Sequence, residues 1–573
     1  MSDESVVRSA TAVTRYRGWP LFALIALVGA FLITRWTAEQ PSYTDAFYYF
    51  NAGERLAHGQ GLTDAYLWNY VVLPPELPAP SHLFWMPMPS LMVALGLTLF
   101  GDSYAAAQIP FALMYAGVVL VGFWLGGHIG RTSRHAWVAG LLTLFSGYFT
   151  RFWGATSTFA PYGVFGALCL LCLGMGLTKS GRSMLRPYVW FAFGGVFAAL
   201  GHLSRADGLL LLAVGWAAIL WEIKNLAQGR REAEKQREEK SVSQRYKGTE
   251  VQGEDLKDFF LANPAFWRFK SVIVLTAAYL LVMSVWFVRN LNAVGTPLPV
   301  SGASAVWLTE YNDLFNYPPN VSMGRFFENG IGLLISSRWS AFTTNLATFV
   351  GVEGLIVMTP LMLIGLWRRR REAFLRPFWL YALGLHLAMT LAFPFPGSRG
   401  GLFHSAAALV PFWAALGVVG LDDVVDWIAR RRRRWKANTA KLVFSVALLG
   451  LAAALSWMVS GAGRTFAATP RLYRELVQRL PADGRVMIND PSQMYYFTKL
   501  GGVSLPNAAP DVIREIAARY DIDYLLLEFE MRNGQRVAPG IPNGLLPILD
   551  NPPDFLSPVP LDTPNARLYA IES

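Results

Sequence analysis

The sequence predicts an α-helical polytopic membrane protein with about 11 transmembrane helices, further helices on the outer membrane surface, and a small C-terminal α/β domain. Of the 573 residues, 53% are hydrophobic and only 16% are charged, whereas a soluble domain has roughly 25% charged residues. Apolar runs recur along most of the chain, each near the roughly 20 residues that cross a bilayer. After about residue 465 the composition changes, and helical and strand patterns alternate.

The apolar runs are justified as membrane spans by their length and by the residues that flank them. The first run follows Arg8, Arg15 and Arg17 and has no small-residue cleavage site after it, so it predicts an uncleaved helix rather than a signal peptide. The predicted spans are 19–35, 104–127, 136–150, 159–177, 187–202, 208–222, 270–289, 346–367, 377–393, 405–422 and 441–460.

The net charge of +11 comes from basic residues that cluster at the ends of apolar runs, which is typical of cytoplasmic loops and not of a nucleic-acid surface. With a cytoplasmic N-terminus (1–18), the basic loops alternate correctly. The inner side then receives Arg131, Arg134, Lys179, Arg182, Arg186, the runs 367–371 and 430–436, and the charged loop 223–268, which we expect to be mobile. The outer side receives 36–103, 204–208, 290–345, 393–404 and the domain 461–573. The transmembrane domain is 19–460.

One apolar segment, 81–101, does not fit this alternation. As a twelfth span it would invert every later basic loop. Its prolines Pro87 and Pro89 and its modest length favour an interfacial or re-entrant helix on the outer side, with 83–101 at the membrane surface.

The C-terminal part predicts a small α/β domain of about 110 residues. The stretches "RLYRELVQRL", "PSQMYYFTKL" and "PDVIREIAARY" have helical patterns, and "RVMIND", "GVSLP" and "DYLLLEF" are typical of strands. No G-x-G-x-x-G follows the first strand, which argues against a dinucleotide site. A cap that shapes or stabilises the substrate site is the favoured interpretation.

Several kinds of chemistry lack their motifs in this sequence. The two cysteines, Cys169 and Cys172, lie in one apolar run and are interpreted as helix-packing residues rather than as a metal or redox pair. Zinc spacing, a P-loop, G-x-S-x-G and nucleic-acid motifs are also missing from the sequence.

Ionisable residues at membrane depth are functional candidates because an unpaired buried charge is costly. The candidates share the predicted outer side: Asp45, Arg205, Arg289, Arg399 and His404. An acid opposite several arginines and a histidine suits a substrate that carries a phosphate, because arginine binds phosphate through two hydrogen bonds and stays charged. The acid can serve as a base or help to hold a metal.

Each candidate also has a structural interpretation. Asp45 follows Thr44, a predicted N-cap, so its charge can stabilise a helix dipole. Arg205 can pair with Asp207 across a tight turn that Gly208 relieves. Arg289 can extend to the lipid headgroups, and His404 can begin an interfacial helix.

The aromatic residues of the first outer loop have two interpretations as well. Tyr48, Tyr49, Trp68 and Trp85 can form an aromatic belt at the membrane surface or a platform for a sugar ring, and the belt is favoured.

Taken in order, several segments resemble the GT-C superfamily of polytopic glycosyltransferases, in the bacterial branch similar to protein O-mannosyltransferases and aminoarabinose transferases. They are "TDAFYYFNAGERLAHGQG", "PSHLFWMPMPSLMVALGLTLFG", "HLSRADGLL", "WFVRNLNAVGTPLP" and "FHSAAALVPFWAALGV", within residues 19–460. The resemblance rests on their order and shared side rather than on one specific motif.

The resemblance implies an enzyme that moves a sugar from a polyprenyl-phosphate donor to an acceptor outside the membrane, with inversion at the anomeric carbon. Asp45 matches the family's catalytic base in the first outer loop. Arg205, Arg289, Arg399 and His404 would surround the phosphate, and Tyr48 and Tyr49 would contact the substrate. Membrane lipids and a protein, lipid or glycan acceptor are the other implied partners.

Two departures from the family leave alternatives open. Ala46 follows Asp45 where many relatives carry a second acid, which makes a Mg or Mn cofactor doubtful because one carboxylate is a poor site for either metal. "PSHLFWMP" stands where many relatives have a "KPPL"-like stretch, which leaves the donor and acceptor open. The alternatives are a polysaccharide polymerase or ligase, a lipid-linked sugar transporter or flippase, and a non-catalytic membrane scaffold.

Overall fold

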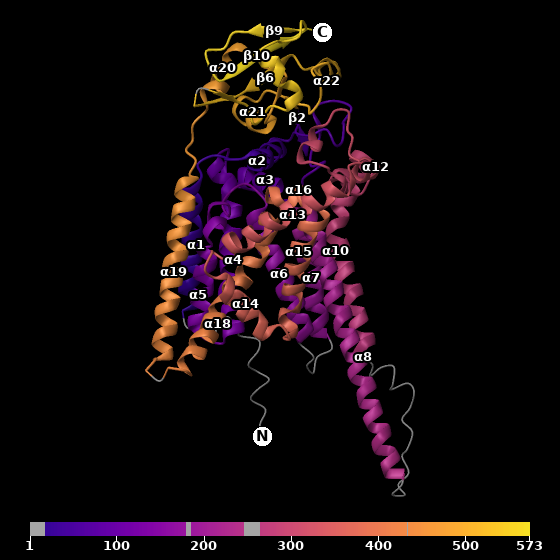
Figure 1. Ribbon diagram of the computed structural model, residues 1–573, viewed down its shortest axis with the longest axis vertical. Coiled ribbons are helices and arrows are strands. Elements are labelled where there is room, and N and C mark those ends of the chain that lie inside the picture. The colour runs from indigo at the N-terminus through magenta and orange to yellow at the C-terminus, as the bar shows by residue number, and fades with distance from the viewer. Residues whose placement is uncertain (1–17, 179–184, 246–263, 433, 534, 573) are drawn as a thin grey trace.

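The structure is a computed structural model that describes residues 18–178, 185–245, 264–432, 434–533 and 535–572. It consists of a helical bundle with a sheet-containing layer across one end (Figure 1). We call this the sheet end. The opposite end, which carries the runs 367–371 and 430–436 at the ends of helices, is called the basic end.

The bundle is that of a multi-pass membrane protein. Within the described residues, seven helical segments are long and apolar enough to cross a membrane. They are Trp19–Thr37, Tyr104–Gly130, Phe159–Thr178, Ala206–Asn225, Phe269–Val294, Pro394–Ala429 and Ala437–Ala462. Five of these segments lie in α1 (Trp19–Thr37), α4 (Tyr104–Gly130), α6 (Phe159–Thr178), α10 (Pro264–Val294) and α19 (Ala437–Ala462). The other two begin in short helical turns and continue into α8 (Leu209–Arg245) and α18 (Val410–Ala429).

The other four predicted spans, 136–150, 187–202, 346–367 and 377–393, overlap five helices, and the total of eleven stays a prediction. These helices are α5 (Ser133–Leu144), α7 (Leu185–Ser204), α13 (Gly330–Thr348), α14 (Thr359–Arg369) and α15 (Arg376–Leu387). The prediction of one span at 346–367 was wrong. α13 ends at Thr348, a π-helical turn covers Phe349–Glu353, and α14 starts only at Thr359. Gly351, Gly354 and Pro360 weaken the helix there, because glycine is flexible and proline lacks a donor.

The prediction of a mobile charged loop at 223–268 was also wrong for its described part. α8 continues without a break to Arg245 and extends beyond the bundle at the basic end (Figure 1). The segment 226–245 is rich in Ala, Glu, Lys, Arg and Gln, which have high helix propensity, so a helix persists without an apolar face. Residues 246–263 lie outside the described residues.

Short helices lie between the bundle and the sheet. α2 (Thr44–Ala57) and α3 (Met88–Phe100) belong to the first predicted outer loop. α3 has 13 residues and so rises only about 20 Å, against roughly 30 Å of bilayer hydrocarbon. It therefore does not span by itself, in agreement with the prediction for 81–101. The later loop holds α11 (Val300–Ser304) and α12 (Met323–Glu328), and α16 (Pro394–Pro396) and α17 (Leu402–Ala406) precede α18.

The C-terminal part alternates helices and strands in the predicted order. The helices are α20 (Arg471–Arg479), α21 (Pro491–Thr498) and α22 (Val512–Tyr520), and the strands are β4 (Val486–Ile488), β5 (Gly502–Ser504), β6 (Tyr524–Glu528), β9 (Leu556–Val559) and β10 (Ala566–Ile571). A six-stranded sheet has the order β2-β5-β4-β6-β10-β9. β7 (Glu530–Arg532) pairs with β8 (Gln535–Val537), and β1 (Thr63–Asp64) pairs with β3 (Ala79–Pro80).

The sheet is not built from the C-terminal part alone. Its edge strand β2 (Tyr66–Leu67) comes from the first predicted outer loop and pairs in parallel with β5, Tyr66 opposite Gly502. Tyr70 donates a hydrogen bond to the Ser504 carbonyl. Ser504 Oγ in turn donates a hydrogen bond of 2.5 Å to the Trp68 carbonyl. The first loop and the C-terminal sheet therefore fold as one unit.

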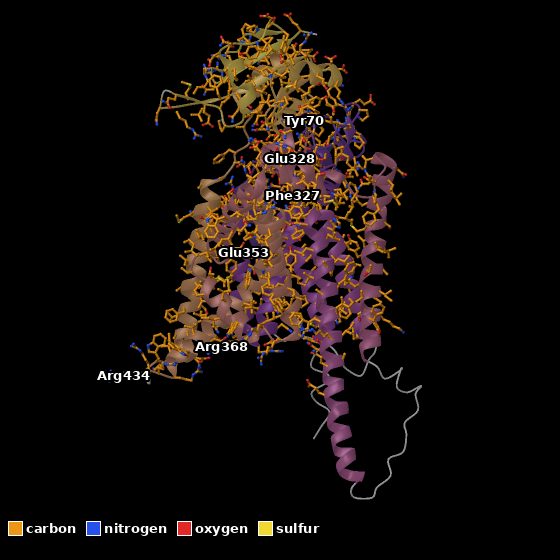
Figure 2. All side chains as sticks on the ribbon, turned by 45° about the vertical axis from the view of Figure 1, so that its right-hand side comes forward. Tyr70, Phe327, Glu328, Glu353, Arg368 and Arg434 are labelled. Carbon is orange, nitrogen blue, oxygen red and sulfur yellow. The ribbon has the colours of Figure 1, made fainter. Side chains whose placement is uncertain are left out.

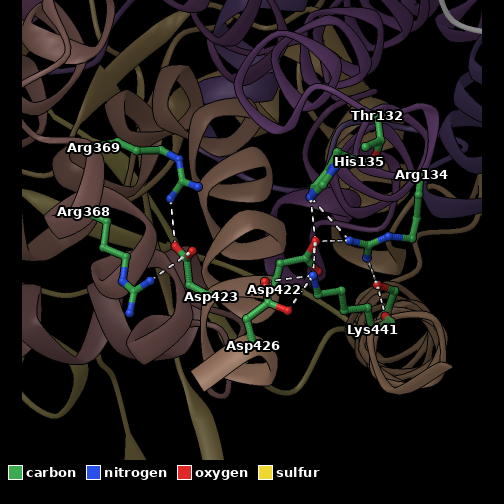
Figure 3. Close-up of polar contacts among 10 residues, drawn as sticks. Thr132, Arg134, His135, Arg368, Arg369, Asp422, Asp423, Asp426 and Lys441 are labelled. Carbon is green, nitrogen blue, oxygen red and sulfur yellow. Dashed lines mark hydrogen bonds and ion pairs between the residues drawn. The ribbon is translucent and has the colours of Figure 1, made fainter. Parts of the chain in front are cut away.

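At the basic end, acids on α18 connect three helices. Asp422 pairs with Arg134 of α5 and lies 3.0 Å from His135, while Asp426 pairs with Lys441 of α19 at 2.8 Å (Figure 3). Because removing one partner of a buried pair leaves an uncompensated charge, these contacts fix the order in which α5, α18 and α19 pack.

Candidate functional site

The site is built around the first turn of α2, at the sheet end of the bundle (Figure 1). Tyr43 is the N-cap residue, with extended backbone, and its side chain makes no capping hydrogen bond. The prediction that Thr44 is the N-cap was therefore wrong. At the other end, Gly59 closes the helix with φ of +76°, a left-handed conformation that glycine adopts without strain.

Asp45 lies in this first turn with a side chain that is one quarter exposed. Its Oδ2 is 3.9 Å from His404 Nε2. Burial raises the pKa of Asp45 to about 6, the positive charge of Arg205 opposes this shift, and the negative charge of Asp490 adds to it. The carboxylate is thus a stronger base than an ordinary aspartate while remaining reachable from solvent.

His404 is held in place by two neighbours. Its Nδ1 is 2.7 Å from Thr158 Oγ1, and its ring stacks on Phe159 with centroids 4.0 Å apart. These contacts direct Nε2 toward Asp45. His404 is the third residue of α17 and lies inside the helical segment Pro394–Ala429, so the interpretation of His404 as a helix-start residue was wrong.

Arg205 connects two helices beside Asp45. Its Nε is 2.9 Å from Asp207 Oδ1 and 2.8 Å from Ser405 Oγ, which itself donates to the other Asp207 oxygen. The predicted pairing of Arg205 with Asp207 is confirmed. Gly208 is required by close packing rather than by its φ, since a Cβ there would lie 2.6 Å from the backbone of His202.

Arg399 approaches the same region from a π-helical turn, Gly397–Gly401, in which Gly400 has φ of +119°. Its guanidinium lies over the Tyr311 ring, 4.6 Å from the centroid. Both residues line a cleft of 220 Å³ with Glu310, Asn312, Phe395 and Ser398. Burial and the Asp45 charge raise the pKa of Tyr311 to about 12, and the charge of Arg399 opposes this shift.

Arg289 belongs to a second cluster. Its Nη2 donates to the Leu62 carbonyl at 3.0 Å, and its guanidinium lies over the Trp286 ring. Burial raises the pKa of Asp64 to about 7, against the hydrogen bond from Tyr48 and the charges of Arg55 and Arg289, which lower it. The charge of Arg289 therefore acts on Asp64.

Tyr48 and Tyr49 are 4% and 1% exposed, so the belt interpretation is wrong for both, and so is the interpretation as an open sugar platform. Tyr48 donates to Asp64 Oδ2 at 2.8 Å and accepts from the His82 amide at 2.7 Å. The Asp45 charge contributes to a raised pKa of Tyr49. Tyr49 thus forms part of the wall beside Asp45. Trp68 and Trp85 are half-buried and pack on one another with centroids 4.2 Å apart.

Asp490 is the residue that sequence reasoning missed. It caps α21 by accepting from the Gln493 amide at 3.0 Å, and its Oδ2 accepts from Thr44 Oγ1 at 2.6 Å. Asp490 therefore lies next to the turn that carries Asp45 and supplies a second acid near it. The only sequence signal was the "NDP" N-cap pattern of α21, which carries no information about α2.

A divalent metal does not fit these residues well. Among the described residues, no group of three or more His, Cys, Asp or Glu side chains lies close enough together to hold a metal. Asp45 faces His404, and both Asp490 oxygens already accept hydrogen bonds. We derive no catalytic step from a metal here.

No protein-family model matches the sequence. The search of curated proteins also gave no match. Solved structures do match the fold. ArnT from Cupriavidus metallidurans, bound to undecaprenyl phosphate, is similar with a TM-score of 0.53 at 13% identity over 96% of this chain and 98% of that chain. Its apo state has a TM-score of 0.52 over the same shares, also at 13% identity.

A second similar structure is the archaeal oligosaccharyltransferase AglB from Archaeoglobus fulgidus, in complex with an inhibitory peptide and a dolichol-phosphate. Its TM-score is 0.50 at 12% identity, over 89% of this chain and 70% of that chain. At such identities the likeness shows the fold.

Proposed function

Since the chain has the fold of the GT-C superfamily, we propose that it is a membrane glycosyltransferase that uses a polyprenyl-phosphate-linked sugar donor. The observation that carries this proposal is the position of Asp45. A carboxylate with a pKa of about 6 stands one quarter exposed at the sheet end, beside His404, Arg205 and the cleft of Tyr311 and Arg399. A base and nearby cations are what transfer from a phosphate-linked sugar requires.

The proposed reaction balances without a cofactor. An acceptor O–H or N–H gives its proton to an Asp45 oxygen while the acceptor atom bonds to the anomeric carbon. The bond from that carbon to the phosphate oxygen breaks, and the phosphate leaves with the electron pair. Attack opposite the leaving group inverts the anomeric carbon. Because a phosphate is a stable anion, no strong general acid is needed.

The arginines and the imidazole of His404 divide between two roles in this proposal. His404, Arg205 and Arg399 approach the Asp45 region from three separate elements and are the proposed phosphate-binding set. Arg289 is proposed to support the Asp64 cluster, because its charge acts on Asp64 and its guanidinium donates to the Leu62 carbonyl of the same loop. The role of Arg289 in binding phosphate stays a prediction.

Orientation in the cell is part of the proposal. The basic residues gather at the end opposite the sheet, and short cationic loops favour the cytoplasm. We therefore assign the sheet and Asp45 to the extracytoplasmic side. The acceptor, a protein, lipid or glycan, would reach Asp45 from this side.

The test is the substitution Asp45→Asn in the full-length protein, reconstituted with undecaprenyl-phosphate-linked sugars extracted from cells that contain the enzyme. We expect release of undecaprenyl phosphate, with sugar mass added to an acceptor, to fall by about 10²-fold or more. The control is Asp102→Asn, the same change at an exposed acid that pairs with His58 at 3.2 Å.

Equal thermal unfolding temperatures of the two variants would exclude misfolding. Full turnover by Asp45→Asn would contradict the assignment of the base. Transport of intact donor without transfer, in the unsubstituted protein, would favour a flippase instead.

A further inference from the structure

A large apolar groove lies at the basic end, far along the bundle from Asp45. Its volume is 1190 Å³, above the roughly 300–1,000 Å³ typical of ligand pockets. Three helices form its walls: α14, α15 and α18. On α15, Trp379, Leu383 and His386 have the spacing that places side chains on one helix face.

The packing of the three helices explains why a groove forms between them. α14 and α18 pack backbone to backbone, because a Cβ on Gly365 would lie 2.2 Å from the Leu416 carbonyl and one on Gly420 would lie 1.9 Å from the Leu361 carbonyl. α15 packs mainly against α8 and α6 and touches α18 through Phe378, which stacks on Phe412. An open space remains between the rest of α15 and the α14–α18 pair.

The mouth of the groove is positively charged. Arg368 and Arg370 line it together with Asp423. Asp423 is shared by two arginines, with Arg369 Nη1 at 2.8 Å and Arg368 Nη1 at 3.3 Å (Figure 3). Arg370 donates only to the carbonyl of Trp367 among the described contacts. Two guanidinium groups thus share one carboxylate and Arg370 adds a third positive charge, which leaves an excess of positive charge for an anion.

Two exposed tryptophans lie at the mouth of the groove, beside these arginines. Trp367 and Trp427 line the groove, are 66% and 47% exposed, and each lies under an arginine: Arg370 at 3.7 Å and Arg431 at 3.9 Å from the ring centroid. Tryptophan and arginine together are typical of the headgroup level of a bilayer. The groove mouth therefore lies where lipid phosphates lie.

The inner end of the groove is close to neutral. Figure 2 places Glu353 about midway along the bundle and Arg368 near the basic end. Glu353 Oε1 lies 3.1 Å from His386 Nε2, and Oε2 accepts from Trp413 Nε1 at 2.8 Å. Because the carboxylate is compensated, Phe349, Trp413 and His386 present a wall that hydrocarbon can contact.

We propose that this groove binds an anionic phospholipid, with its acyl chains between α14, α15 and α18 and its phosphate on Arg368 and Arg370. The charge of the mouth selects an anionic over a zwitterionic headgroup, because juxtamembrane arginines attract anionic lipid and arginine pairs closely with phosphate. The site is independent of the proposed sugar transfer, since it lies at the other end of the bundle.

The test uses the purified full chain and native mass spectrometry, with dioleoyl phosphatidylglycerol and dioleoyl phosphatidylcholine as probes. We expect phosphatidylglycerol to be retained about tenfold more than phosphatidylcholine. Arg370→Gln, which leaves both ion pairs of Asp423 in place, should lower phosphatidylglycerol retention about fivefold. Leu383→Trp should reduce retention of both lipids by filling the groove.

Arg434→Gln serves as the matched control, because it removes an exposed arginine at the same end that does not line the groove. Equal retention of both lipids by the unsubstituted chain would overturn the headgroup assignment. If the double variant Arg370→Gln with Leu383→Trp still retained phosphatidylglycerol over phosphatidylcholine, the lipid would bind outside the groove. If the unsubstituted chain formed dimers and Leu383→Trp dissociated them, the groove would instead be an interface between copies of the chain. Thermal unfolding confirms that each variant is folded.

Discussion

Thr44 Oγ1 donates a 2.6 Å hydrogen bond to Asp490 Oδ2, across 446 residues of sequence. This bond joins the first turn of α2 to the cap of α21. It is supported by the Asn51 side chain, which donates to the Ser492 carbonyl at 2.8 Å, and by Lys499, which pairs with Glu54 at 2.5 Å. The sheet unit therefore controls the position of the turn that carries Asp45, in addition to covering the bundle.

The first prediction concerns pH. The pKa of Asp45 is raised to about 6, and only its ionised form can accept a proton. We therefore expect kcat/KM to rise about tenfold per pH unit below pH 6 and to level off above it. A profile of sugar transfer between pH 4.5 and 8 would check this. A rate that stays flat down to pH 4.5 would contradict a base with this pKa.

The second prediction is that Asp490→Asn moves the rising part of the pH profile of kcat/KM, called the acid limb, to lower pH. The negative charge of Asp490 raises the pKa of Asp45, so its removal lets Asp45 ionise at lower pH, by up to about one unit. Asp554→Asn, at an exposed acid of the same C-terminal part, should leave the pH of the acid limb unchanged. A purely structural role of Asp490 would lower the rate without moving the limb.

The third prediction tests the proposed phosphate-binding set. Arg399→Ala should weaken binding of undecaprenyl phosphate, used as the probe, by about tenfold or more, because a hydrogen bond to a charged group contributes about 1.5–3 kcal/mol. Native mass spectrometry or a fluorescence titration would measure it. Arg474→Ala, at an exposed arginine of α20, is the control. Unchanged binding by Arg399→Ala would remove Arg399 from the set.

The fourth prediction concerns packing of α14 on α18. Gly365→Ala should destabilise the bundle by about 1–3 kcal/mol, because its Cβ would lie 2.2 Å from the Leu416 carbonyl. Gly450→Ala on α19 meets no atom within 4 Å and should be neutral or slightly stabilising. Unfolding by heat or denaturant in detergent compares the two. Equal stability would show that α14 and α18 can separate.

The fifth prediction concerns orientation. Cys169 and Cys172 are buried, so single cysteines introduced at Asp554 and Arg432, both exposed, report on the two ends. A membrane-impermeant maleimide should label Asp554→Cys in intact cells and should label Arg432→Cys only after lysis. The reverse pattern would place the sheet and Asp45 in the cytoplasm.

Much of the fold was predictable because its signals are local. Apolar length and flanking charge predicted the membrane helices, and period and propensity predicted α20, β4, α21, β5, α22 and β6 in order. The break at Phe349–Glu353 was missed because an apolar run conceals a change in helical pitch. The helical extension of α8 was missed because charged residues without an apolar stripe resemble a loop.

The site was predictable only in part. Asp45, His404, Arg205 and Arg399 share one end of the bundle, as charge alternation and the family resemblance implied. The hydrogen bond from Arg289 to the Leu62 carbonyl was not predictable, because the environment of Arg289 depends on which loop folds over it.

By itself the sequence determined a multi-pass helical protein with basic residues at one end and an alternating α/β segment after residue 465, because each of these features follows from neighbours along the chain. The tertiary structure decided that β2 completes the C-terminal sheet, that Tyr48 and Tyr49 are buried, and that Asp490 stands beside the turn of Asp45. The first and last of these contacts join residues more than 400 positions apart, and no local pattern of side chains specifies such a pair.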